Sequence, residues 1–161
     1  MYYANYFFIF SLLGHFIESF FYKSGDGGIL YGPYTPVYGI GVCIIVFMTN
    51  LINKKNIKLK PFYIFLTGFI ILSFVEFIGG IIIEKIFKVV FWNYSDMKFH
   101  IGNYISLEMA IIWGISSLVV SYLIKPFFDK WIKKIPKCIT WILIILFVID
   151  CLTTFFTKVF F

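Results

Sequence analysis

The sequence predicts an all-α membrane protein, a bundle of about five transmembrane helices with a non-helical Gly/Pro entry before the second helix. Hydrophobic residues make up 61% of the 161 residues and charged residues only 14%, against about 25% in an ordinary soluble domain. Five apolar stretches each approach the roughly 20 residues that cross a hydrocarbon core about 30 Å thick. We expect one integral membrane domain covering residues 1–161, without a second domain.

The expected spans cover residues 3–22, 36–53, 61–84, 104–125 and 138–157. The first span has no basic start and no small-residue cleavage site, so we interpret it as a retained helix rather than a signal peptide. The second span is the shortest. The third is the longest, and we expect it to tilt or to extend past the membrane.

Residues 32–39, which we call the entry segment, read Gly-Pro-Tyr-Thr-Pro-Val-Tyr-Gly. Pro33 and Pro36 fix φ and remove two backbone donors, while Gly32 and Gly39 allow geometry closed to other residues. Non-helical backbone at membrane depth persists only where protein covers it or where it lines a polar cavity. We therefore expect a rigid pocket wall whose following helix N-terminus could hold a glutamate or an anionic ligand. The alternative is a simple proline-marked helix start at the interface.

Four of the eight acidic residues lie in or beside the expected spans near the same membrane face, namely Glu18, Glu76, Glu84 and Glu108. An ionised side chain at the bilayer centre costs roughly 2.5–3.5 kcal/mol even on a mild scale, so such residues usually serve a function. From the helical rise of about 1.5 Å per residue, Glu18 and Glu76 lie at equal depth in the outer half of the bilayer. We expect these two to face each other across a polar interior.

Other polar residues near these carboxylates have plainer interpretations beside the functional one. His15 shares a helix face with Glu18, but it could simply bond a neighbouring helix. Glu84 could pair with Lys88, and Glu108 could be a first-turn carboxylate favoured by the helix dipole. Asp150, midway along the fifth span, is either protonated or in contact with a partner helix. The candidate ligand-binding residues are His15, Glu18, Tyr38, Glu76, Trp92, Asn103 and Glu108.

The sequence contains no recognised catalytic, nucleotide-binding or dinucleotide-binding motif. We expect no cofactor and no resident metal, although the histidine and glutamates could form an unspecific mixed N/O site. The three cysteines show no CxxC pair and no disulfide framework, so we interpret them as small apolar fillers. The net charge of +6 comes from loop lysines, so we expect membrane lipids rather than nucleic acid as partners.

Loop lysines set the expected orientation, since cytoplasmic loops carry the excess of positive charge. The loops after the second and fourth spans together carry nine lysines, and the two opposite loops carry four. This split places the N-terminus in the cytoplasm and the C-terminus outside. We expect a multi-pass protein of the plasma (cell) membrane.

The motifs, in this order, resemble the CmpB-like family, named "putative ABC-transporter type IV", over about residues 14–126. The resemblance rests on Gly14 with Glu18-Ser19, on the Gly-Pro-x-x-Pro-Val-Tyr-Gly of the entry segment, on Glu76 and Glu84, on Trp92-x-Tyr94-Ser95, on Ser106-Leu107 and on Trp113-Gly114. The family reads Trp-Asp-Tyr-Ser and Gly-Arg where this chain has Asn93 and Gly102-Asn103. Two amides thus replace an Asp–Arg pair, and any family activity that needs this charge pair is expected to be altered.

The resemblance implies a transporter component, with energy supplied by a partner membrane subunit, an ATPase or an ion gradient. The carboxylate pocket would then open toward the outer leaflet, with the entry segment as wall or lid. Two alternatives stay open. One is an intramembrane enzyme, metal-dependent or not, that acts on a lipid-linked substrate. The other is a small helper subunit whose buried acids only fix helix pairing.

The orientation can be tested by cysteine labelling in intact cells, with the three native cysteines replaced. A membrane-impermeant maleimide should reach single cysteines in the 25–28 loop and at the C-terminus, because the lysine split places both outside. Labelling of a single cysteine in the 54–60 loop would contradict this orientation.

Overall fold

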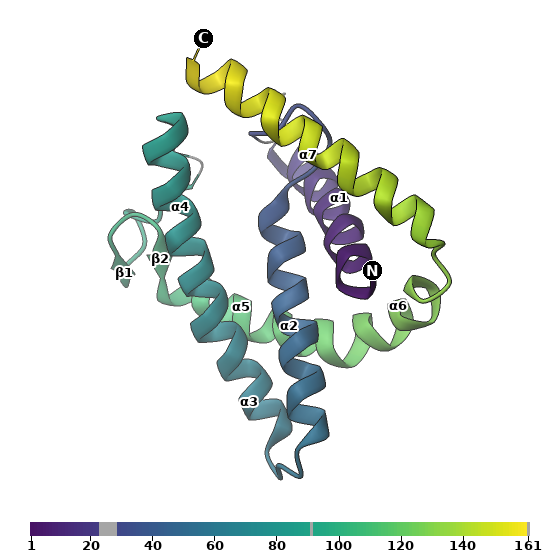
Figure 1. Cartoon of the computed structure of the whole chain (residues 1–161). Helices are drawn as coiled ribbons and strands as arrows, with labels where there is room; N and C mark the ends of the chain where they lie inside the picture. The colour runs from purple at the N-terminus through teal and green to yellow at the C-terminus, as the bar shows by residue number, and fades with distance from the viewer. Residues whose placement is uncertain (23–28, 91, 161) are drawn as a thin grey trace. The chain divides into compact units, whose positions relative to one another are not determined.

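The computed structural model describes residues 1–22, 29–90 and 92–160 (Figure 1). These residues form two compact units. The first unit combines both ends of the chain, Met1–Cys43 and Phe128–Phe161, and the second comprises Ile44–Phe127.

The helices and strands follow in chain order: α1 (Tyr2–Tyr22), α2 (Pro36–Lys54), α3 (Lys60–Thr67), the π-helical turn η1 (Gly68–Leu72), α4 (Ser73–Phe87), β1 (His100–Ile101), β2 (Ile105–Ser106), α5 (Leu107–Val119), the π-helical turn η2 (Val120–Ile124), α6 (Lys125–Ile132) and α7 (Lys137–Phe160). The run α3–η1–α4 is one continuous helix, and so is the run α5–η2–α6.

Within the described residues, four helices are long and apolar enough to cross a membrane: Pro36–Lys54, Lys60–Phe87, Leu107–Ile132 and Lys137–Val159. Together with the almost complete absence of strands in this part of the chain, they confirm an all-α, multi-pass membrane protein. The first predicted span also forms a helix, α1, but it is not among these four. Its crossing of the membrane therefore stays a prediction.

The helix ends follow local chemistry, and they shift two of the expected boundaries. A proline in the first turn starts α3, where its missing donor does no harm. Lys88 adopts the left-handed conformation, φ 57°, and ends α4 beyond the expected residue 84. The expected start of the fourth span at residue 104 is also displaced, because Ser106 caps α5 by accepting a hydrogen bond from the Met109 N–H at 3.2 Å. The same helix then continues through α6 to Ile132, so much of the expected 125–137 loop is helical.

The short antiparallel hairpin before α5 was not expected from the sequence. Strand β1 pairs with β2 in the register His100↔Ser106 and Ile101↔Ile105. Gly102 closes the turn at φ 60°, a conformation that glycine adopts without a steric penalty. Two-residue strands carry little hydrophobic periodicity, so the pattern of the sequence does not reveal them.

The second unit is built around close contact between α5 and the α3–η1 part of the long helix (Figure 1). A Cβ added to Gly68 would lie 1.9 Å from Ser117 Oγ and 2.5 Å from the Trp113 carbonyl oxygen. On the same helix pair, a Cβ on Gly114 would lie 2.5 Å from the Phe65 ring. Small residues thus let the two backbones approach, as is usual between helices in lipid.

In the first unit, α1 packs against α7 and a buried polar cluster links its start to the α6–α7 connection. The Asn5 amide donates to the Ile132 carbonyl at 3.3 Å and accepts from the Thr140 hydroxyl at 2.6 Å. Tyr6 donates its hydroxyl to Asp129 at 3.0 Å, and Tyr2 donates to the same carboxylate. Buried polar groups paired in this way stabilise one arrangement of the helices.

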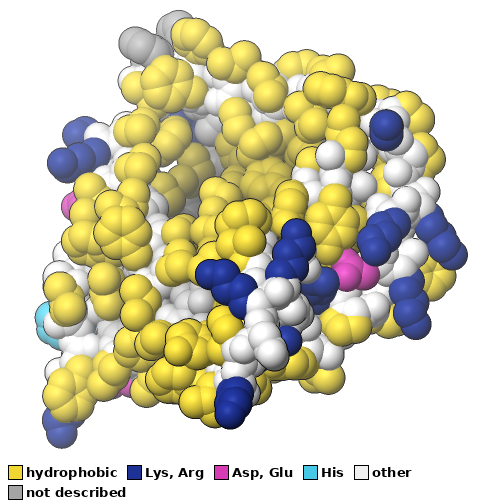
Figure 2. Space-filling view, turned by 60° about the horizontal axis from the view of Figure 1, so that its bottom comes forward, with side chains coloured by type: hydrophobic (Ala, Val, Ile, Leu, Met, Phe, Trp, Pro, Cys, Tyr) yellow, Lys and Arg dark blue, Asp and Glu magenta, His cyan; other side chains and the backbone are white. Residues whose placement is uncertain are grey.

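The surface is largely apolar, as expected for helices in contact with lipid. Hydrophobic side chains cover much of the face in Figure 2, and the lysines lie among them, most of them over its central and right-hand part. Phe20 is 79% exposed and Leu123 68% exposed. The buried set combines hydrophobic side chains with Asn5, Glu76 and several serine and threonine side chains. An apolar exterior over an interior that includes these polar groups supports the assignment to a membrane.

The helix contact in the second unit predicts that Gly68→Ala destabilises the protein by about 1–3 kcal/mol, the usual effect of overpacking. The added methyl group would collide with backbone as well as with Ser117. Gly79→Ala is the matched control, because its Cβ would meet the Trp92 ring at an ordinary 3.9 Å. Thermal unfolding in detergent should show a lower midpoint for Gly68→Ala alone. Equal midpoints for both variants would contradict the proposed close contact.

Candidate functional site

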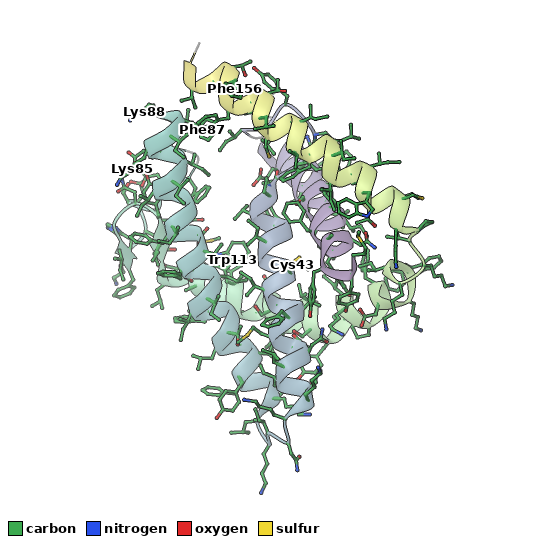
Figure 3. The ribbon with its side chains drawn as sticks, in the orientation of Figure 1. Cys43, Lys85, Phe87, Lys88, Trp113 and Phe156 are labelled. Carbon is green, nitrogen blue, oxygen red and sulfur yellow. The ribbon has the colours of Figure 1, made fainter. Side chains whose placement is uncertain are left out.

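Glu76 is the buried carboxylate of the second unit. It lies in the first turn of α4 and is 6% exposed. Its Oε1 accepts a hydrogen bond from the Tyr94 hydroxyl at 2.7 Å, and its Oε2 accepts one from Trp113 Nε1 at 2.8 Å. Figure 3 labels Trp113 on α5. Both oxygens are thus held by donors from aromatic side chains, one from a loop and one from the neighbouring helix.

The loop after α4 places Tyr94 by backbone hydrogen bonds. The Tyr94 N–H donates to the Asn103 carbonyl at 2.8 Å, and the Met97 N–H donates to the Tyr94 carbonyl at 2.9 Å. Asn93 Oδ1 accepts from the Ser95 N–H at 2.9 Å. The two amides that depart from the family pattern therefore both belong to the loop that presents Tyr94.

Two further aromatic side chains, Tyr104 and Trp92, lie near the part of α4 that follows Glu76. The Tyr104 ring packs on Gly80, where an added Cβ would lie 2.5 Å from ring carbon Cδ1, and the Tyr104 hydroxyl donates to Glu84. This hydrogen bond, with burial as the second cause, raises the pKa of the Tyr104 phenol above its ordinary value. Trp92 meets Tyr104 edge to face at 6.4 Å between ring centroids. Trp92 Nε1 is buried without a hydrogen-bond partner among the described residues.

Glu18 is a half-buried carboxylate of the first unit, and the entry segment packs against it. The Thr35 hydroxyl donates to Glu18 Oε2 at 3.3 Å, and the Tyr38 side chain lies near this carboxylate. His15 lies near enough to interact electrostatically with Glu18, and its Nδ1 is buried without a partner in the described chain. A carboxylate, two hydroxyl groups and an imidazole thus lie together in this unit.

Two glycines let the entry segment and α2 approach this face of α1. A Cβ on Gly14 would lie 2.5 Å from the Tyr38 ring, and a Cβ on Gly39 would lie 2.2 Å from Ser11 Oγ. The Thr35 N–H donates to the Ser11 carbonyl at 3.0 Å. The predicted non-helical entry before the second helix is confirmed for residues 29–35, whereas residues 36–39 of the entry segment are helical and form the start of α2.

The other predictions about the site are considered residue by residue. Glu18 and Glu76 belong to different units, so their meeting in one pocket stays a prediction. Glu108 is exposed in the first turn of α5, which fits its plainer interpretation. Asn103 contributes its backbone carbonyl, which accepts the hydrogen bond from the Tyr94 N–H. Trp92 packs against Tyr104, and Tyr38 packs against α1 at Gly14. Within the described residues, no three histidine, cysteine or acidic side chains are grouped so that they could hold a metal ion.

A shallow depression of about 410 Å³ lies at the C-terminal end of α4, lined by Glu84, Lys85, Lys88 and Val90. Figure 3 labels the two lysines at this end of the helix. Lysines in this position favourably oppose the negative end of the helix dipole. The depression adjoins Glu84 and not Glu76, so the predicted pocket around Glu76 is not supported by it.

The sequence prediction omitted the donors that hold the carboxylates. Tyr94, Tyr104, Trp113 and Thr35 were not named as site residues. Tyr94 and Trp113 belong to the motifs quoted for the family, and Thr35 falls at an unspecified position of one of them. Asp150 was noted only as an outlier. It accepts hydrogen bonds from the Tyr31 N–H at 3.1 Å and the Gly32 N–H at 3.0 Å. The family motifs therefore carried a signal for Tyr94 and Trp113.

A family model described as "Putative ABC-transporter type IV" matches residues 5–155 of the 161. This match extends beyond the 14–126 region on which the resemblance rested and includes most of α7. No curated protein and no solved structure showed a significant match to the chain.

The contact between Tyr94 and Glu76 predicts that Tyr94→Phe destabilises the protein by about 1–3 kcal/mol, because a buried acceptor loses its partner. A double-mutant cycle with Glu76→Gln should give a coupling energy of about 0.5–3 kcal/mol in thermal or chemical unfolding. The control Tyr122→Phe removes a hydroxyl from a side chain that is 47% exposed. Additive effects of the two substitutions would show that the hydrogen bond contributes nothing to stability.

Proposed function

Because the chain belongs to the "putative ABC-transporter type IV" family, we propose that it is the membrane component of a transport system in which Glu18 and Glu76 handle the ligand. The ligand is a cation or carries a cationic group, since carboxylates with neutral donors keep a negative charge to be matched. The ligand-handling region lies in the outer half of the bilayer. The chain resides in the plasma membrane with its N-terminus in the cytoplasm.

One observation carries this proposal. In each unit, a carboxylate on an apolar helix accepts a hydrogen bond from the side-chain hydroxyl of a residue that lies in irregular backbone. Tyr94 supplies the hydroxyl to Glu76, and Thr35 supplies one to Glu18. Irregular backbone within membrane proteins is typical of cavities and ligand pathways. Among the described residues, each Glu76 oxygen accepts one side-chain hydrogen bond, whereas a carboxylate offers about four acceptor positions. Capacity for a further charged partner therefore remains.

The energy source lies outside the chain. The sequence has no Walker motif, so an ATP-hydrolysing partner or an ion gradient must drive transport. The lysine-rich connection at residues 54–60 would face a cytoplasmic partner in the proposed orientation. An ATPase is the partner that the family description favours.

The proposal predicts that an ATP-hydrolysing subunit co-purifies with the tagged chain from its native host in mild detergent. Glu18→Gln and Glu76→Gln should leave insertion and complex formation intact. Each should reduce the transport-coupled component of ATP hydrolysis by about tenfold, the effect of losing roughly 1.4 kcal/mol of ligand interaction. ATP hydrolysis by equal amounts of complex in proteoliposomes measures this component.

Asp96→Asn serves as the control, because it removes an exposed acidic side chain from a loop of the second unit. Its hydrolysis rate should equal that of the parent. If an ATPase co-purifies but both glutamine variants hydrolyse ATP at the parent rate, the carboxylates have no ligand role. If the variants only unfold at lower temperature and no ATPase co-purifies, the helper-subunit interpretation replaces transport.

A further inference from the structure

We infer that Asp150 is a positioning residue for the Glu18 site, through which α7 holds the entry segment in place. Asp150 has no role in the proposed function as stated above. The inference rests on that function only in treating the Glu18 surroundings as a ligand site.

The Asp150 carboxylate binds two successive backbone amides at the start of the entry segment. Its Oδ1 accepts from the Tyr31 N–H at 3.1 Å, and its Oδ2 accepts from the Gly32 N–H at 3.0 Å. Hydrogen bonds to an ionised acceptor are about twice as strong as neutral ones. Glycine is required for this approach, because a Cβ on Gly32 would lie 2.7 Å from Oδ2.

Further contacts come from the same face of α7. Phe147, one turn before Asp150, meets the Tyr34 ring edge to face at 5.6 Å between centroids. One turn after Asp150, the Thr154 hydroxyl donates to Asp150 Oδ1 at 3.4 Å. Beyond it, Thr157 bonds the Tyr31 hydroxyl at 2.9 Å. The spacing of three, four and three residues defines one helix face, and that face lies along the backbone before α2.

The other end of the entry segment reaches Glu18. The Tyr34 N–H donates to the Gly32 carbonyl at 2.8 Å, which tightens the backbone between the two ends. The Thr35 N–H then donates to the Ser11 carbonyl, and the Thr35 hydroxyl donates to Glu18. Only two residues lie between Gly32, whose amide binds Asp150, and Thr35, whose hydroxyl binds Glu18. Asp150 therefore acts on Glu18 through the entry segment.

Without the Asp150 charge, the Gly32 amide loses its ionised acceptor, and the Tyr31 amide keeps only its longer bond to the Thr154 hydroxyl at 3.4 Å. The segment is then held less firmly from the α7 side. The Thr35 hydroxyl then spends less time on Glu18. Glu18 becomes both less well paired and more accessible from the membrane. Glu76, in the other unit, has its own donors and should not respond.

The experiment uses the purified full chain in lipid nanodiscs and a hydrophobic carbodiimide, which modifies carboxyl groups from the lipid side. Mass spectrometry follows the rate of modification at Glu18 and at Glu76 in the same sample. Asp150→Asn should raise the Glu18 rate by about tenfold, the factor expected for the loss of one strong hydrogen bond. The Glu76 rate should stay at the parent value, and Asp96→Asn should change neither rate.

Gly32→Ala is a second variant that keeps the Asp150 charge but separates the carboxylate from the entry segment. It should also raise the Glu18 rate alone. An unchanged Glu18 rate in both variants would overturn the inference. A parallel rise at Glu18 and Glu76 would also overturn it, because a purely structural role loosens the whole chain. These rates do not depend on ATP hydrolysis, so failure of the transport proposal is recognised separately.

Discussion

A carboxylate in an apolar helix requires hydrogen-bond donors, and this requirement shapes both units of the protein. A regular helix cannot supply them, because its own N–H groups are already bonded. The donors are instead side chains of residues that lie in irregular backbone or on a neighbouring helix. Tyr94 and Trp113 reach Glu76 in this way, and Thr35 reaches Glu18. The loops of this protein are therefore part of its interior chemistry rather than simple connectors.

Close backbone approach is the second element of this design, since a donor can reach a carboxylate only where side-chain bulk is absent. Gly80 leaves room for the Tyr104 ring, and Gly14 leaves room for the Tyr38 ring. Both glycines lie four residues from a glutamate on the same helix, which places them on the same face. On each of the two helices, a glutamate thus shares a face with a glycine, and an aromatic ring packs over that glycine.

The sequence predicted the parts of this arrangement that depend on long-range patterns. Apolar runs predicted the helices, and the two prolines predicted the irregular backbone that ends at Pro36. It did not predict which donors reach which acid, because the Trp113–Glu76 contact depends on the packing of α5. Nor did it predict the bonds of Asp150, since its partners are backbone amides that any residue except proline carries. The hairpin before α5 was missed because its strands are only two residues long.

The first unit joins the two ends of the chain, Met1–Cys43 and Phe128–Phe161, whereas the second is continuous. The ribosome delivers α7 after the other described helices, so the helix face that holds the entry segment emerges after α1 and after the whole second unit. Chains generally fold in the order of synthesis. We expect the continuous unit to assemble first, at a stage when α7 does not yet hold the entry segment near Glu18. Insertion of α7 would then be the step that completes the surroundings of Glu18.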